Sequence, residues 1–153
     1  MSVDSESVRT LRMEKRFEKM KTSRLVQSYR DLELYQSCFH FQQAIFVVSR
    51  KFPKEEIYSL TDQLRRSSRS IAANLAEAWS KRRYEAHFLS KLTDSDGELQ
   101  ETTHWLRTAC SCEYVTKSEC EPLIQQATQI GKMLGSMIAS YRDFCSKPSR
   151  PID

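Results

Sequence analysis

The chain has 153 residues, of which 29% are charged and 39% hydrophobic, so it can form one domain with a modest core. Its three glycines and four prolines are too few for a β-sandwich or a Rossmann unit. The net charge of +4 is small, but residues 1–30 and 64–83 hold the whole basic excess, and the remaining chain is acidic or neutral.

The sequence shows neither a signal-peptide pattern at its start nor an apolar run of membrane-spanning length. We therefore expect a cytoplasmic protein with no membrane contact. In that compartment the five cysteines are predicted to be reduced thiols, most of which pack as small hydrophobic side chains. Cys110-Ser111-Cys112 lacks the two-residue spacer of a zinc knuckle and has no second pair, so neither a metal site nor a cofactor is predicted.

Residues 1–28 are predicted to be an N-terminal extension, partly helical or disordered, because Met13, Phe17 and Met20 have helical spacing in an otherwise polar segment. Residues 29–147 are predicted to form an all-α, antiparallel up-down-up-down four-helix bundle, and residues 148–153 a C-terminal tail. The apolar stripes of the four helices are Leu34, Cys38, Phe41, Ile45, Val48 and Phe52; Leu60, Leu64, Ile71, Leu75 and Trp79; Tyr84, Phe88, Leu92, Leu99, Leu106 and Cys110; and Leu123, Ala127, Ile130, Leu134, Met137, Tyr141 and Phe144.

Local signals place the ends of these helices. Asp31 is predicted to cap the first helix, which ends at Phe52-Pro53, and the second is predicted to open at 54–56. Residues 80–83 are the predicted turn before the third helix. Thr116 and Glu119 have the spacing of a capping box at the start of the fourth, and Pro148 marks its end.

A polar stripe runs along the second helix beside its apolar stripe. Its members recur at steps of three and four residues, and they are Gln63, Ser67, Ser70, Asn74 and Glu77. A solvent face usually carries Lys and Glu instead. We therefore predict a polar seam at a helix–helix or subunit contact, with an ordinary exposed face as the alternative.

Basic residues gather on and just after the same helix, and they are Arg65, Arg66, Arg69, Lys81, Arg82 and Arg83. Guanidinium groups pair with phosphates in a bidentate manner, so we predict these six residues to bind the backbone of RNA or DNA. The alternative is that Arg65 and Arg69 pair with acids of a neighbouring helix or subunit and serve assembly.

The segments 31–35, 52–66 and 70–77, with Glu98-Leu-Gln-Glu101 and Gly131-Lys-Met-Leu134, resemble the bacterial four-helix-bundle proteins encoded in intervening sequences of 23S rRNA genes. Ala78 departs from the glycine that usually follows the glutamate of that family. The resemblance implies a cytoplasmic homo-oligomer, pentameric in known relatives. A related branch, the accessory variability determinant of diversity-generating retroelements, binds nucleic acid and a reverse transcriptase.

Two spacings point to enzymes. Glu101-Thr-Thr-His104 matches one half of a di-iron site, but the chain has no second such pair, so His104 is predicted to be a polar surface residue. Arg82 and His87 have the spacing of helical ribonucleases that resemble the HEPN superfamily.

We predict a non-catalytic, oligomeric bundle that binds nucleic acid through repeated basic patches, as an accessory to a nucleic-acid-processing enzyme. The alternative is a scaffold that binds protein partners and uses its arginines in assembly, and the third interpretation is a HEPN-like ribonuclease.

Overall fold

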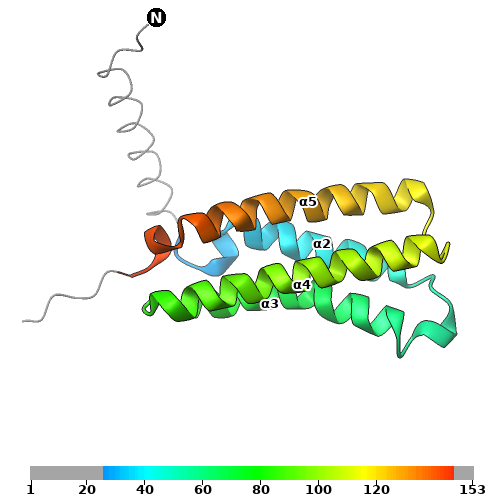
Figure 1. Cartoon of the computed structure of the whole chain (residues 1–153), viewed down its shortest axis with the longest axis horizontal. Helices are drawn as coiled ribbons and strands as arrows, with labels where there is room; N and C mark the ends of the chain where they lie inside the picture. Colours follow the sequence, from blue (N-terminus) through cyan, green and yellow to red (C-terminus); the bar gives the residue numbers. More distant parts are fainter. Residues whose placement is uncertain (1–25, 147–153) are drawn as a thin grey trace, which may run out of the picture.

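The computed structural model describes residues 26–146, and it consists of four long helices that lie side by side (Figure 1). They are α2 (Glu33–Ser49), α3 (Leu60–Ser80), α4 (Glu85–Ser111) and α5 (Lys117–Ala139). Short 3-10 turns, η1 (Tyr29–Asp31), η2 (Lys54–Glu56) and η3 (Tyr141–Phe144), stand at the ends or between them. Both α3 and α5 pack against α2 and α4. The predicted all-α, up-down-up-down bundle is confirmed.

The core is made by the predicted apolar stripes. Leu64, Ile71, Phe88, Leu106 and Leu134 are completely buried along the axis of the bundle. Burial of such side chains contributes about 1.5–3 kcal/mol each, which makes this core the main source of stability. No helix within residues 26–146 is long and apolar enough to cross a membrane. Most of the predicted extension and the whole predicted tail lie outside the described residues.

The ends of the helices agree with the sequence at one cap and differ at another. The Thr116 hydroxyl accepts from the Glu119 amide and the Glu119 carboxylate accepts from the Thr116 amide, which confirms the capping box. The prediction that Asp31 caps the first helix is wrong, because Leu32 is the N-cap of α2. Asp31 instead accepts from the amide of Ser28 and closes a capping box on η1.

Three further boundaries lie elsewhere than predicted. The helix α2 ends at Ser49 rather than at Phe52, and residues 54–56 form η2, separated from α3 by three turn residues. The reason is local: Glu56 accepts hydrogen bonds from the Ser59 hydroxyl and the Leu60 amide, so a side chain satisfies the first donor of α3. The fourth helix ends at Ala139, well before Pro148, and η3 begins at Tyr141.

One predicted core residue faces solvent. Tyr84 is 59% exposed because it is the N-cap of α4. It therefore precedes the first helical residue, and its side chain does not share the buried face of the helix. Its ring packs against His87 one turn later, with 5.6 Å between the ring centroids. The prediction that Tyr84 belongs to the core is therefore wrong.

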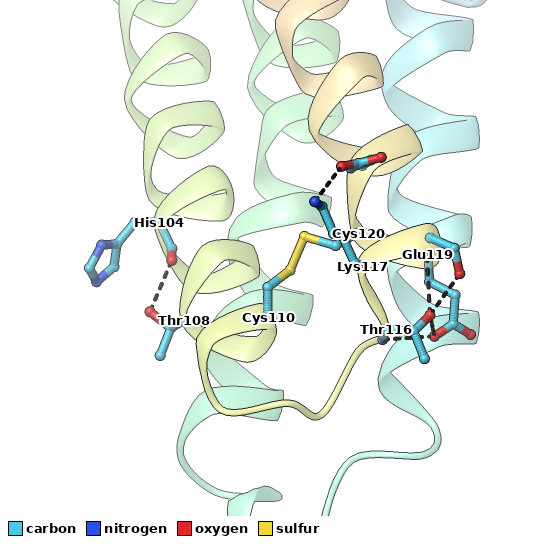
Figure 2. Close-up of a disulfide and its surroundings, with 9 residues drawn as sticks. His104, Thr108, Cys110, Thr116, Lys117, Glu119 and Cys120 are labelled. Carbon is cyan, nitrogen blue, oxygen red and sulfur yellow. Dashed lines mark hydrogen bonds and ion pairs between the residues drawn. A yellow bond between two sulfur atoms is a disulfide. The ribbon is translucent and has the colours of Figure 1, made fainter.

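A disulfide joins Cys110 in the last turn of α4 to Cys120 in the first turn of α5 (Figure 2). The α4–α5 connection folds back on itself, so the two Cα atoms lie 6.4 Å apart, a separation that a disulfide can bridge. The prediction of reduced thiols is therefore wrong for this pair. Cys38, Cys112 and Cys145 are free, and burial raises the pKa of the Cys38 thiol to about 12.

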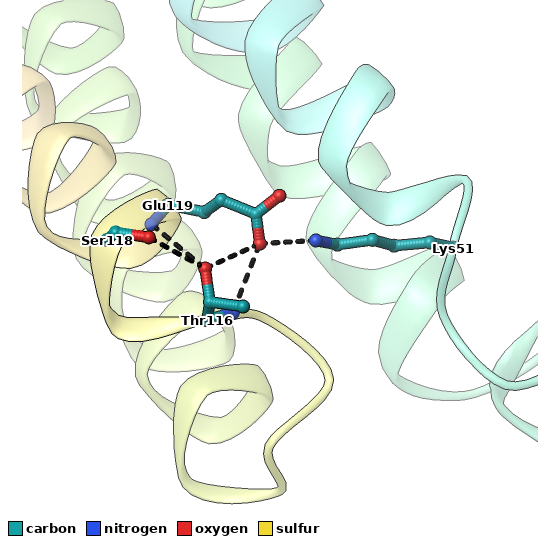
Figure 3. A network of polar contacts seen from close by, with 4 residues as sticks. All are labelled: Lys51, Thr116, Ser118 and Glu119. Carbon is teal, nitrogen blue, oxygen red and sulfur yellow. Dashed lines mark hydrogen bonds and ion pairs between the residues drawn. The ribbon is translucent and has the colours of Figure 1, made fainter.

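A polar network secures the same end of the bundle (Figure 3). Glu119, already held by Thr116, forms an ion pair with Lys51, which follows α2. These bonds lower the pKa of the Glu119 carboxyl to about 2, the hydrogen bond from Lys51 having the largest effect. The network therefore links the start of α5 to the end of α2, beside the disulfide that links it to α4.

Candidate nucleic-acid and subunit interfaces

Arg65 and Arg69 lie on the side of α3 that faces α2. Arg65 donates from Nε to the Ser49 hydroxyl at 2.7 Å, and its guanidinium lies 4.9 Å from the centroid of the Phe46 ring. The Arg69 guanidinium lies 5.7 Å from the same ring. Neither arginine has a carboxylate partner within residues 26–146, so the positive charge on this side of α3 is not neutralised.

Arg66 points to a different side of α3. It forms an ion pair with Asp62 one turn earlier, with 3.6 Å between the nitrogen and the oxygen. Because both side chains are largely exposed, this pair contributes little to stability.

The turn between α3 and α4 carries the other three predicted bases, and each has a different environment. Lys81 pairs with Glu77 at 3.2 Å. The Arg82 guanidinium lies 3.5 Å from the centroid of the Trp79 ring, and its Nε donates to the Trp79 carbonyl. Burial lowers the pKa of Arg82. The Arg83 side chain is exposed and has no polar or ring contact in the described part of the chain.

The six bases therefore do not form one patch. Arg65 and Arg69 lie on the α2 side of α3, Arg66 lies on another side of the helix, and the other three lie in the turn that follows it. Twelve residues of helix separate Arg69 from Lys81, which corresponds to about 18 Å of rise. The sequence did not reveal the two aromatic rings that hold the arginines. Trp79 lies three residues before Arg82, a spacing that indicates contact on a helix, whereas Phe46 belongs to another helix and gives no such signal.

The predicted polar seam lies on the side of α3 that faces α4. Ser67 is buried, and its hydroxyl lies 3.0 Å from that of Thr102 on α4. One turn further along, the Ser95 hydroxyl of α4 donates to the Ile71 carbonyl of α3 at 2.9 Å. These bonds cross a helix–helix contact within one copy of the chain.

The other members of the seam are less enclosed. Gln63 is exposed, and Ser70 and Asn74 are half-buried, with no side-chain hydrogen bond among the described residues. Glu77 forms ion pairs with Lys81 and, at 3.1 Å, with Lys91 of α4. The hydrogen bond from Lys91 is the largest cause of the lowered pKa of Glu77.

Three carboxylates on α4 form an acidic stripe that the sequence reasoning missed. Asp94, Glu98 and Glu101 follow one another at steps of four and three residues, which places them on one face of the helix. Burial raises the pKa of Glu98, and the charges of Glu101 and Asp94 raise it further. Glu98 has no cationic partner within residues 26–146.

The residues of the two enzyme interpretations lie at the surface. Glu101 accepts a hydrogen bond from the Trp105 indole at 3.1 Å, and the exposed His104 ring packs edge-on against Trp105. Among residues 26–146 there is no group of three His, Cys, Asp or Glu side chains able to hold a metal ion. Arg82 and His87, the two residues of the ribonuclease-like spacing, contact different rings. Arg82 lies on the ring of Trp79, and His87 packs against the ring of Tyr84.

These features define a small all-α protein, an antiparallel four-helix bundle with a basic turn at one end. The chain belongs to the family of 23S rRNA-intervening sequence proteins, whose sequence model matches residues 30–136. A solved protein from Bacteroides thetaiotaomicron, of unknown function and from the S23 ribosomal protein family, has the same fold. It is 29% identical with a TM-score of 0.63, over 69% of this chain and 95% of that one. No curated protein matches the sequence.

Proposed function

We propose that the protein is a non-catalytic homo-oligomer that binds RNA or DNA through the basic turn of residues 81–83, repeated once per subunit. The proposal places it in the cytoplasm, as an accessory to a nucleic-acid-processing enzyme. A pentamer is the expected subunit number from the resemblance to known relatives. Repeated weak sites on one assembly would bind a long polyanion much more tightly than a single site does.

The observation that carries this proposal is the environment of Arg83. Its guanidinium is exposed and unpaired within the described residues, so it can contact a phosphate without first losing another partner. Lys81 adds a second positive charge to the turn. This charge is only partly neutralised, because the Glu77 carboxylate pairs with both Lys81 and Lys91. Arg82 is held against Trp79, and we assign it the role of shaping the turn rather than of binding phosphate.

A second candidate function rests on Arg65 and Arg69. Both lie against Phe46, and Arg65 is also bonded to Ser49, so they are less available to a phosphate than Arg83 is. This arrangement favours a scaffold in which these two arginines contact protein. The two functions are compatible, because Arg65 and Arg69 lie on α3 whereas residues 81–83 lie in the turn that follows it.

The test is a fluorescence anisotropy titration of a labelled single-stranded RNA and a labelled DNA duplex at two salt concentrations. Phosphate contacts release counterions, so affinity for the duplex falls with salt by about 0.9 logarithmic units per decade for each phosphate neutralised. We expect Arg83→Glu to weaken binding at low salt and to flatten this salt dependence. Lys132→Glu, at an exposed position of α5, is the matched control and should leave both unchanged.

Equal titrations of the wild type and Arg83→Glu would contradict the assignment of the site. No binding of either probe by the wild type at low salt would contradict the proposed function itself. The circular dichroism spectrum of each variant checks that the bundle still folds.

A further inference from the structure

The side of the bundle made by α2 and α3 exposes aromatic rings beside unneutralised arginines. Tyr35 and Phe39 stack on one another with 6.3 Å between centroids, and Phe39 is 43% exposed. Phe46 continues the same side of α2 two turns later, with Arg65 and Arg69 against its ring. We call these five residues the aromatic–arginine face. Aromatic residues and arginine are the types most enriched in protein–protein interfaces.

The acidic stripe of Asp94, Glu98 and Glu101 has the opposite charge. Asp94 contacts Lys91 at 3.4 Å and Glu101 accepts from the indole of Trp105, so two of the three carboxylates have a local partner. Glu98 between them has none in the described part of the chain, and its neighbours are like charges. A half-buried carboxylate in this position is stabilised by a cation brought from outside.

The two surfaces lie on different sides of the molecule. Arg65 reaches Ser49, which places the aromatic–arginine face on the α2 side of α3. The Ser67–Thr102 and Glu77–Lys91 contacts place α4, and with it the acidic stripe, on the other side of α3. One copy of the chain can therefore present the arginines to one neighbour while its carboxylates receive those of another.

The spacing of the charges also matches. Arg65 and Arg69 are four residues apart on α3, and Asp94 and Glu98 are four residues apart on α4, which corresponds to about 6 Å in both helices. Two helices that pack side by side can thus form two ion pairs at once. Phe46, which both arginines contact, and Trp105, which donates to Glu101, supply the apolar contact that an interface needs.

We propose that the aromatic–arginine face of one copy packs against the acidic stripe of a second copy, with Arg69 and Arg65 pairing with Glu98 and its neighbours. This inference rests on the proposed function, which assigns a homo-oligomer. It adds which two surfaces form the contact between subunits. Because one surface of each copy meets a different surface of the next, the contact is heterologous, and such contacts form a ring when the rotation from copy to copy closes. We include this closed ring in the proposal.

A ring of this kind gives the basic turns a common location. Copies related by one rotation axis carry equivalent residues at the same height, so every turn of residues 81–83 lies at the same rim. The rim then presents one Arg83 per subunit to a single nucleic-acid strand. The arginines of α3 assemble the ring, and the arginine of the turn meets the phosphates.

The experiment is sedimentation velocity of the full chain at a series of micromolar concentrations, without nucleic acid. We expect the wild type to sediment well above the 17.9 kDa of one chain. Arg69→Glu and Glu98→Arg each place like charges in contact, and each should raise the dissociation constant about 30-fold or more. The double variant, with both reversals, restores opposite charges at every contact and should regain most of the association.

Arg107→Glu is the matched control, because it reverses an exposed arginine of α4 outside the acidic stripe and should associate as the wild type does. Circular dichroism melting of all variants separates a lost contact from a lost fold. A monomeric wild type, single variants that associate normally, or a double variant that fails to recover would each overturn the inference. A monomeric wild type that still binds RNA would overturn this contact and the homo-oligomer of the proposed function, and would leave nucleic-acid binding in place. An oligomer that binds no RNA would overturn only the nucleic-acid binding.

Discussion

Removal of the disulfide between Cys110 and Cys120 should lower the stability of the bundle without changing its fold. The disulfide closes a short loop between α4 and α5, and its effect is to limit the conformations of the unfolded chain. Cys110→Ala with Cys120→Ala removes it, and a reductant removes it from the wild type without a change of sequence.

The magnitude follows from the sequence separation of 10 residues between the two cysteines. Closure of a loop of this length removes roughly 9 cal/mol/K of entropy from the unfolded chain, which is about 2.7 kcal/mol at 25 °C. For a domain of this size each kcal/mol corresponds to about 4 °C in Tm, so we expect reduction to lower Tm by about 10 °C.

Circular dichroism melting with and without reductant measures this difference, and thiol titration confirms the redox state before each melt. Cys112→Ser is the control, because Cys112 is exposed and free and its loss should leave both melts unchanged. The entropic reasoning is refuted when the oxidised and reduced wild types melt at the same temperature.

Two further predictions concern hydrogen bonds of the bundle. Glu119→Gln should destabilise the protein above the ordinary carboxyl pKa of 4.5, since a lowered native pKa contributes stability there that is lost as the pH falls towards about 2. Urea unfolding across this pH range should show the wild type and the variant converging near pH 2, and a constant difference would contradict the role of the ionised carboxylate. Thr102→Val removes the hydroxyl that contacts Ser67 across α3 and α4, and should cost about 1 kcal/mol in urea unfolding. An unchanged midpoint would mean that this buried contact contributes nothing.

Much of the fold follows from the spacing of apolar residues. In a helix, residues three and four apart share a face, so a stripe such as Leu64, Ile71 and Leu75 predicts both the helix and its buried side. All three are buried in the structure. The Thr116 cap was equally predictable, since its chemistry is complete within four residues.

The features that depend on two distant segments could not be predicted in this way. Helical periodicity does not reveal that the α4–α5 connection brings Cys110 and Cys120 together. Nor does the wheel of α3 alone show that Arg65 and Arg69 lie against the Phe46 ring of α2. The ends of α2 and α3 differ from the prediction because a side chain, that of Glu56, caps α3 in place of a continued helix.

The polar seam is predictable only in part, because it too depends on two distant segments. The spacing of its residues indicates a contact, but only the structure identifies α4 as the partner helix, by placing Ser67 against Thr102. The acidic stripe was overlooked because a row of carboxylates on a helix usually faces water. Its significance depends on Arg65 and Arg69, which lie on the other side of α3.

The most direct test of the central claim is sedimentation velocity of the wild type mixed with a fluorescently labelled single-stranded RNA, followed at the wavelength of the label. We expect the RNA to move with a protein assembly several times the mass of one chain, and we expect Arg83→Glu to leave the assembly intact while the RNA sediments free. RNA that sediments free beside the wild-type protein at low salt would contradict the claim that the assembly binds nucleic acid.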